Sequence, residues 1–191
     1  MPTLFSRSSR RTSPVPAGTW AIDPAHSTMG FSVKHLGIAT VRGTFETFEG
    51  TLTVGDELLS GRISGTIDAG SISTQEAQRD EHLRSADFFD VAAHPQITFT
   101  AEVLRQRDEE EFDIDGELTM HGVTRPVSLH ALVQGLETDP WGQERVGIEI
   151  TGQLSRGEYE MKFNQVLGSG NVLVSDTVKI RLDISAIKQA A

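Results

Sequence analysis

Residues 112–121, with the sequence FDIDGELTMH, carry the alternation of apolar and polar side chains that decides the fold class. Phe112, Ile114 and Leu118 stand at alternate positions, and acidic or hydroxyl side chains fill the positions between them. This spacing sends the two kinds of side chain to opposite faces of a β-strand. The stretch therefore predicts a strand with one dry face and one wet face, which is typical of antiparallel sheets.

The same two-residue period recurs along the chain after residue 19. It is clearest in residues 31–34, 96–103, 145–154 and 177–184, and further runs lie near 40–54, 61–73 and 125–136. Together these segments predict eight or more strands joined by short polar connections. Such strands either close into an up-and-down barrel or pack as a sandwich, and the period alone favours neither.

Small residues on the predicted dry face favour the barrel. In a barrel of about eight strands, small inward residues leave volume for one ligand. Glycines also mark bulges and bends of coiled strands, so the choice between a cavity and a bend stays open. The small residues concerned are Gly65, Ala69, Ala101, Gly116, Ala131 and Gly152.

Residues 73–90, with the sequence STQEAQRDEHLRSADFFD, break the two-residue period and predict one short helix. Ser73 and Glu76 have the spacing of a capping box, and apolar residues follow at helical intervals. A helix at the end of a barrel either gates the interior or merely covers it.

Composition excludes several classes of function. The chain has 17 Lys and Arg against 27 Asp and Glu, a formal net charge of −10, so we expect no nucleic-acid partner. Without cysteine it has no disulfide, thiolate metal site or thiol nucleophile. The six histidines form neither H-E-x-x-H nor H-x-H, so we expect no metal site. No triad or acid–base constellation stands out, and we expect no catalytic residues and no enzymatic activity.

The first 16 residues are rich in Ser, Pro and Arg and contain no apolar run. They predict a disordered lead-in, followed by a single domain at residues 17–191. No secretory signal is recognised, and no stretch approaches the roughly 18 apolar residues of a membrane helix. The sequence therefore predicts a cytoplasmic protein.

Several linked motifs resemble those of the YceI family of polyisoprenoid-binding, lipocalin-like proteins. They are residues 20–27, 31–35, 42–50, the RDEHLRSADFFD of 79–90, residues 95–99, and the GELTMHGVTRPV of 116–127. The resemblance implies a single extended antiparallel, lipocalin-like β-barrel of about eight strands with one short helix near the barrel end. It also implies a hydrophobic tunnel for a polyprenyl chain such as an isoprenoid quinone.

On this resemblance the bound polyisoprenoid is the expected ligand, and no other cofactor is expected. The residues expected to line the tunnel are Phe31, Val33, Phe45, Ile67, Leu83, Phe88, Phe89, Ile97, Phe99, Ile114, Leu118, Met120, Leu129 and Ile148. The polar residues expected at the head group or lid are His35, Arg79, Asp80, His82, His121, Arg156 and Glu160. For the histidines, head-group contact and satisfaction of backbone groups both stay open.

Residues 156–161, with the sequence RGEYEM, depart from the family's Arg-x-x-Phe-Gly pattern. Glu160 stands where glycine is usual, and a carboxylate that faced the tunnel unpaired would be costly. If this position faces the tunnel, we expect it to alter the head group or chain length that the tunnel accepts.

Carriage, storage or sequestration of a lipid is the expected function. Two alternatives are an enzyme acting on an isoprenoid or quinone head group, through Asp80, His82 or His121, and a stress-related partner protein whose own side chains fill the barrel. Transient membrane contact and a homodimer formed through exposed sheet edges are further hypotheses.

Overall fold

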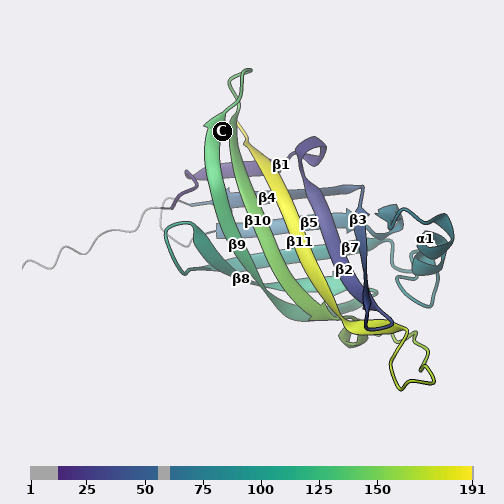
Figure 1. Cartoon of the computed structure of the whole chain (residues 1–191). Helices are drawn as coiled ribbons and strands as arrows, with labels where there is room; N and C mark the ends of the chain where they lie inside the picture. Colours follow the sequence, from purple (N-terminus) through teal and green to yellow (C-terminus); the bar gives the residue numbers. More distant parts are fainter. Residues whose placement is uncertain (1–12, 56–60, 191) are drawn as a thin grey trace, which may run out of the picture.

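The computed structural model describes residues 13–55 and 61–190. Within these residues, eleven strands form one antiparallel sheet that closes into a barrel with eight wall positions (Figure 1). A single α-helix lies at one end of this barrel. The predicted all-β barrel of about eight strands with one short helix near its end is confirmed.

The strands are β1 (Gly18–Ile22), β2 (Thr28–His35), β3 (Ala39–Phe45), β4 (Phe48–Val54), β5 (Gly61–Asp68), β6 (Ile72–Ser73), β7 (Gln96–Gln106), β8 (Glu111–Met120), β9 (Val123–Thr138), β10 (Glu144–Ser155) and β11 (Val174–Lys188). The helical segments are α1 (Ala77–Arg84) and three 3-10 turns, η1 (Pro24–His26), η2 (Ala69–Ser71) and η3 (Arg156–Tyr159).

Eight strand positions run around the barrel, and three of them are each filled by two shorter strands that lie end to end. β1 and β2 both pair with β11, at its opposite ends. β4 then pairs with β1, and β3 with β2. β5 and β6 complete the series, because β5 pairs with β4 and β6 with β3. The pairing of β1 with β11 closes a ring of eight strands, β1, β4, β5, β7, β8, β9, β10 and β11, from which β2, β3 and β6 branch at β11.

The helix is shorter than predicted. α1 covers only Ala77–Arg84, and Ser73 belongs to β6, where it pairs with Thr44 of β3. Glu76 is itself the N-cap, and its carboxylate accepts hydrogen bonds from the next backbone N–H groups. The predicted capping box is therefore wrong, because sheet pairing takes Ser73 away from the helix.

A β-bulge changes the face of β7. Its register with β8 shifts between Ala101 and Val103, and Leu104 then points into the barrel. The single dry face predicted for residues 96–103 therefore ends at Ala101. An extra residue in one strand reverses the alternation that follows it.

Two inward glycines make room for neighbouring side chains rather than for a ligand. A Cβ on Gly116 would lie 2.5 Å from the Phe99 ring, and one on Gly152 would lie 2.5 Å from a methyl group of Leu129. Of the three predicted glycines, Gly65 alone has free space beside it, since the nearest atom to an added Cβ, the Glu49 carbonyl oxygen, is 3.6 Å away. The glycines thus let large side chains pack across strands.

The segment that packs on the barrel core begins before the predicted boundary at residue 17. Val15 is 5% exposed and belongs to the main apolar core. The Trp20 indole N–H donates to the Pro16 carbonyl at 3.0 Å and fixes this entry segment. The lead-in prediction is therefore wrong for residues 13–16, and residues 1–12 lie outside the described part of the chain.

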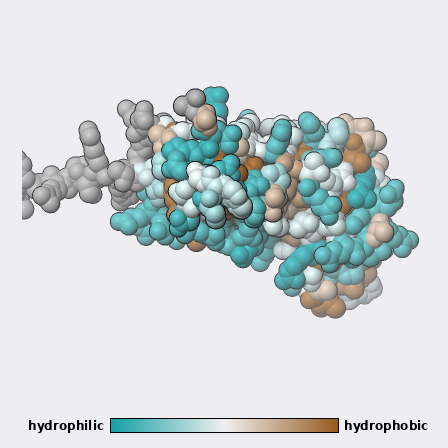
Figure 2. Space-filling view, turned by 90° about the horizontal axis from the view of Figure 1, so that it is seen from above, coloured by the Kyte–Doolittle hydropathy of each residue, from teal (hydrophilic) through white to brown (hydrophobic). Residues whose placement is uncertain are grey.

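Hydrophilic residues dominate the outer face seen in Figure 2, and hydrophobic ones show mainly toward its right-hand end, where α1 lies. None of the helices in the described ranges has the length and apolar character needed to span a bilayer.

Candidate functional site

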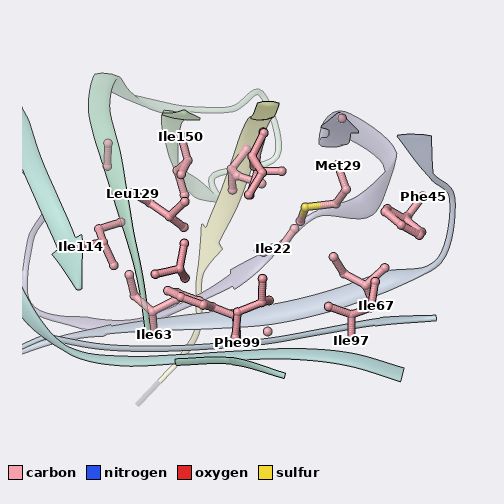
Figure 3. A pocket seen from close by; sticks show the side chains of 18 of the residues that line it. Ile22, Met29, Phe45, Ile63, Ile67, Ile97, Phe99, Ile114, Leu129 and Ile150 are labelled. Carbon is pink, nitrogen blue, oxygen red and sulfur yellow. The ribbon is translucent and has the colours of Figure 1, made fainter. Parts of the chain in front are cut away.

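A cavity of about 310 Å³ lies inside the barrel. Val15 and Ala186 line it at one end, and Leu83 and Phe88 line it at the end of α1. Val174 and Ala186 lie near opposite ends of β11, and both line the cavity, so the cavity is elongated along that strand. Figure 3 shows apolar side chains from different strands pointing into the same space. The cavity is therefore an elongated apolar tunnel.

All of the residues expected to line a tunnel do line this cavity. They are Phe31, Val33, Phe45, Ile67, Leu83, Phe88, Phe89, Ile97, Phe99, Ile114, Leu118, Met120, Leu129 and Ile148. Those on strands reach it because alternate side chains of each strand face inward. Whether they contact a lipid stays a prediction.

Aromatic rings pack against one another at the α1 end of the tunnel. The ring centroids of Phe31 and Phe45 are 5.6 Å apart, and Phe89 meets Phe45 edge to face at 5.7 Å. Phe88 packs on Phe163 at 5.3 Å. These contacts join β2, β3 and the turn after α1 into one apolar cover.

Arg156 places a buried charge at the same end of the tunnel. The side chain lines the cavity, the residue is 6% exposed, and its guanidinium lies 6.0 Å from the Phe88 ring centroid. It donates to the carbonyl oxygens of Met161 at 2.6 Å, Ser175 at 3.0 Å and Val174 at 3.3 Å. Burial lowers the pKa of this guanidinium. No carboxylate of a described residue lies within ion-pair distance of it, so its hydrogen bonds go to backbone carbonyls, and Asp176 acts on its charge only from farther away.

Arg79 and Asp80 fasten α1 to the sheet. The Thr74 backbone N–H and hydroxyl donate to the Asp80 carboxylate at 2.8 and 2.5 Å. The Arg79 guanidinium donates to the Thr74 hydroxyl and carbonyl oxygens at 2.7 and 2.9 Å. Both residues therefore hold α1 at the barrel end, and neither is among the described residues that line the tunnel.

His82 and His35 also lie outside the tunnel lining. His82 contacts the Asp87 carboxylate through Nε2 at 2.7 Å and packs its ring against Phe88 and Phe163. His35 ends β2 and pairs with Val174 in the sheet. Both histidines therefore lie at the α1 end of the barrel, beside the tunnel and outside its lining.

Glu160 faces solvent. It ends η3 in the left-handed conformation, with φ of 63°, and its side chain is 53% exposed. Its carboxylate pairs with Lys162, which lowers the pKa of Glu160. The condition under which this carboxylate would alter the tunnel is therefore not met, because the tight turn points it outward.

His121 lies in the turn between β8 and β9. Its Nδ1 atom is 2.9 Å from the Tyr159 carbonyl oxygen, so this nitrogen carries the proton and donates it. The imidazole therefore satisfies a backbone group and is not among the tunnel-lining residues.

A known protein family matches most of this chain. Residues 20–186 match the family model of the YceI-like domain. The chain belongs to the YceI-like family. The resemblance of its motifs to that family is thereby confirmed.

The YceI-like chain has relatives with clear sequence identity. Protein YceI of Escherichia coli O157:H7 is 41% identical over 138 residues, which cover 72% of each chain. Protein YceI of Salmonella arizonae is 40% identical over 137 residues, which cover 71% of each.

Solved structures share the fold of the YceI-like chain. BcnA of Burkholderia cenocepacia superposes with a TM-score of 0.75 at 18% identity, covering 86% of this chain and 98% of its own. A polyisoprenoid binding domain from Saccharophagus degradans superposes with a TM-score of 0.70 at 17% identity, covering 89% and 98%. At these identities the likeness shows the fold alone.

Sequence reasoning about the YceI-like chain missed several residues of the site. Phe112, Ile150, Ile180 and Leu182 line the tunnel and stand on the same alternating faces, so the period could have found them. Arg84 was also missed. It donates to the carbonyl oxygens of Gly70 and Ile72 and holds α1, but no periodicity in the sequence marks it.

Proposed function

We propose that this protein binds a long polyisoprenoid lipid in its tunnel and carries, stores or sequesters it. The observation that supports this function is an apolar tunnel that runs nearly the length of the barrel. An elongated apolar cavity suits a long hydrocarbon chain better than a compact ligand. The polyisoprenoid-binding domain of similar fold supports the choice of lipid class.

The tunnel competes with a membrane rather than with water. Burying about 40 carbons at ~0.8 kcal/mol each would give about 30 kcal/mol relative to water, above the observed ceiling of roughly 20 kcal/mol. A bilayer solvates the same chain nearly as well as the tunnel does. Selection therefore depends on tunnel length and on a few polar contacts to the head group.

We place the head group at the α1 end, beside Arg156. A carbonyl or anionic oxygen there would accept a hydrogen bond from the buried guanidinium, whose other partners are carbonyl dipoles. Charge-assisted hydrogen bonds of this kind are stronger than neutral ones. An isoprenoid quinone, with its carbonyl oxygens, meets this requirement.

Binding explains the arrangement better than catalysis. Asp80 accepts from Thr74, His82 contacts Asp87, and His121 donates to the Tyr159 carbonyl. Each of these groups therefore already makes a structural contact, and none of them lines the tunnel. The other alternative, a barrel filled by its own side chains, does not agree with a cavity of about 310 Å³.

Mass spectrometry of an organic extract tests the proposed function. Protein purified from its native host should release a polyisoprenoid in near-stoichiometric amount. Repeated recovery of protein without any apolar ligand would overturn the proposal. The same preparation tests three further hypotheses. The extract shows whether the head group is a quinone, and the hydrodynamic mass shows whether the protein is a homodimer. The cell fraction that contains the protein tests the cytoplasmic location.

Arg156→Met tests the position of the head group. Methionine keeps an apolar side chain at the site and removes the charge. We expect the variant to lose at least 10-fold in affinity for a quinone-headed lipid and to keep its affinity for the matching polyprenyl hydrocarbon. Equal losses for both ligands would place the head group elsewhere.

A further inference from the structure

Three polar side chains meet outside the tunnel, at the α1 end of the barrel. Asp90 and His94 lie on the turns that follow α1, and His121 lies between β8 and β9. Each offers one ligand atom, and the three atoms lie within 4.8 Å of one another. All three residues are half-buried. Their positions in the sequence are too far apart for a short metal-binding motif to reveal them.

The His121 imidazole is held in a fixed tautomer. Its Nδ1–H donates to the Tyr159 carbonyl at 2.9 Å, which leaves Nε2 with a free lone pair. Metal-ligating histidines commonly donate their second ring N–H to a backbone carbonyl in this way, because the bond fixes the ring and raises its basicity. The contact to Tyr159 is therefore what a ligand at Nε2 requires.

The backbone around the cluster brings the rings together. His94 and His121 lie 5.1 Å apart between ring centroids. A Cβ on Gly122 would lie 2.6 Å from Cε1 of His94, so glycine at that position lets the His94 ring approach the turn. The His94 backbone N–H donates to the Asp90 carbonyl at 2.8 Å, which fixes the spacing of these two residues.

We propose that Asp90, His94 and His121 form a binding site for a divalent transition metal, with Zn²⁺ as the best fit. Two imidazole nitrogens and one carboxylate oxygen are a common zinc set, and water completes the tetrahedron. Imidazole ligands also disfavour Mg²⁺ and Ca²⁺, which prefer oxygen.

The metal would fasten the α1 end of the barrel. Asp90 follows Phe89, and His121 follows Met120, and both of these neighbours line the tunnel. His121 also contacts η3 through Tyr159. A bound ion would thus join the turns after α1, the β8–β9 turn and η3. The site does not depend on the lipid proposal, since no metal contact lies in the tunnel.

Titration of the metal-free full chain with ZnCl₂, followed by calorimetry, tests the site. We expect one Zn²⁺ per chain and a higher melting temperature with Zn²⁺ than with a chelator. Asp90→Asn, His94→Gln and His121→Asn should each weaken Zn²⁺ binding at least 10-fold. Asparagine suits positions 90 and 121 because both have positive φ, 45° and 53°.

His26→Gln is the matched control. His26 also contacts a carboxylate, that of Asp23 at 2.7 Å, but its side chain is 67% exposed and lacks a third ligand among the described residues. This variant should bind Zn²⁺ like the natural protein. The site is overturned if the natural protein binds no Zn²⁺, if the three variants bind it unchanged, or if only His26→Gln loses it. His94→Gln, at an unstrained position, decides the case if another variant fails to fold.

Discussion

Asp23 joins two distant parts of the barrel through one side chain. Its carboxylate lies 2.6 Å from the Arg145 guanidinium and 2.7 Å from His26. Arg145 also pairs with Asp139 at 2.8 Å, in the turn between β9 and β10. Hydrogen bonding to Arg145, followed by that to His26, lowers the pKa of Asp23 from 3.8 to about 2.

Asp23→Asn should lower stability at neutral pH and flatten its pH dependence in acid. The pKa of Asp23 is lower in the folded chain than in the unfolded one, so the carboxylate stabilises the fold above pH 3.8. That contribution is lost as the pH falls through about 2. We expect a loss of about 1–2 kcal/mol at pH 7, measured by urea unfolding.

Glu102→Gln is the control for this carboxylate. Glu102 pairs with Arg62, but both side chains are 71% exposed, and such pairs contribute little to stability. An Asp23→Asn variant whose stability followed the same acid profile as the natural protein would contradict the assignment.

Gly116→Ala should destabilise the barrel by about 1–3 kcal/mol. The added Cβ would lie 2.5 Å from both the Phe99 ring and the Thr100 carbonyl oxygen, and the backbone oxygen cannot move aside cheaply. Thermal unfolding measures the loss. Gly168→Ala is the control, since no atom lies within 4 Å of its Cβ position. Equal melting temperatures for the two variants would contradict the packing argument.

At the scale of elements, α1 is a fixed cover more than an independent helix. Thr74 joins it to β6 through Asp80 and Arg79, and Arg84 bonds the carbonyl oxygens that precede it. A helix of this length is marginal in water without such contacts. The opening for a lipid is therefore expected among the neighbouring turns rather than by melting of α1.

Two turns near this end expose apolar side chains. Ile38 is 80% exposed and Val166 is 79% exposed. Their turns are adjacent, because the Leu36 backbone N–H donates to the Leu173 carbonyl at 2.9 Å. Exposed apolar residues at a barrel end suit brief contact with a membrane.

The double variant Ile38→Ser with Val166→Ser should slow the extraction of a polyisoprenoid from neutral phosphatidylcholine vesicles at least 3-fold. Its melting temperature should stay unchanged, because both side chains are in solvent. Trp141→Ser is the control, since Trp141 is 83% exposed in the β9–β10 turn at the other end. Equal slowing by the control would contradict the assignment of membrane contact to the α1 end of the barrel.

At the scale of the whole molecule, the closed wall produces a continuous interior. β11 contributes to it along its length, because it pairs with β10 on one side and with β2 and β1 on the other. The tunnel therefore exists because the sheet closes into a barrel. A bulky side chain placed inside the tunnel should block it.

Ile150→Trp should reduce the bound lipid at least 5-fold, because Ile150 lines the tunnel and a larger ring would fill it. Thr151→Trp places the same side chain at the adjacent position, which faces out of the barrel. Mass spectrometry of extracts measures the lipid, and circular dichroism checks the fold. Full lipid content in folded Ile150→Trp would contradict binding in the tunnel.

The sequence by itself determined the strands, their inward faces and the family. Alternation is a local property, so residues such as Ile114, Leu118 and Ile148 were correctly predicted to point inward. Where local spacing changed, prediction failed: the bulge after Ala101 ended the dry face, and sheet pairing drew Ser73 away from the helix.

Tertiary structure alone decided what meets across the barrel. It placed Arg156 in the tunnel and Glu160 in solvent, although the two are close in sequence, because η3 turns the chain between them. It also brought His121 to Asp90 and His94. Such contacts depend on the closure of strands that are distant in sequence, and no local period of side chains encodes that closure.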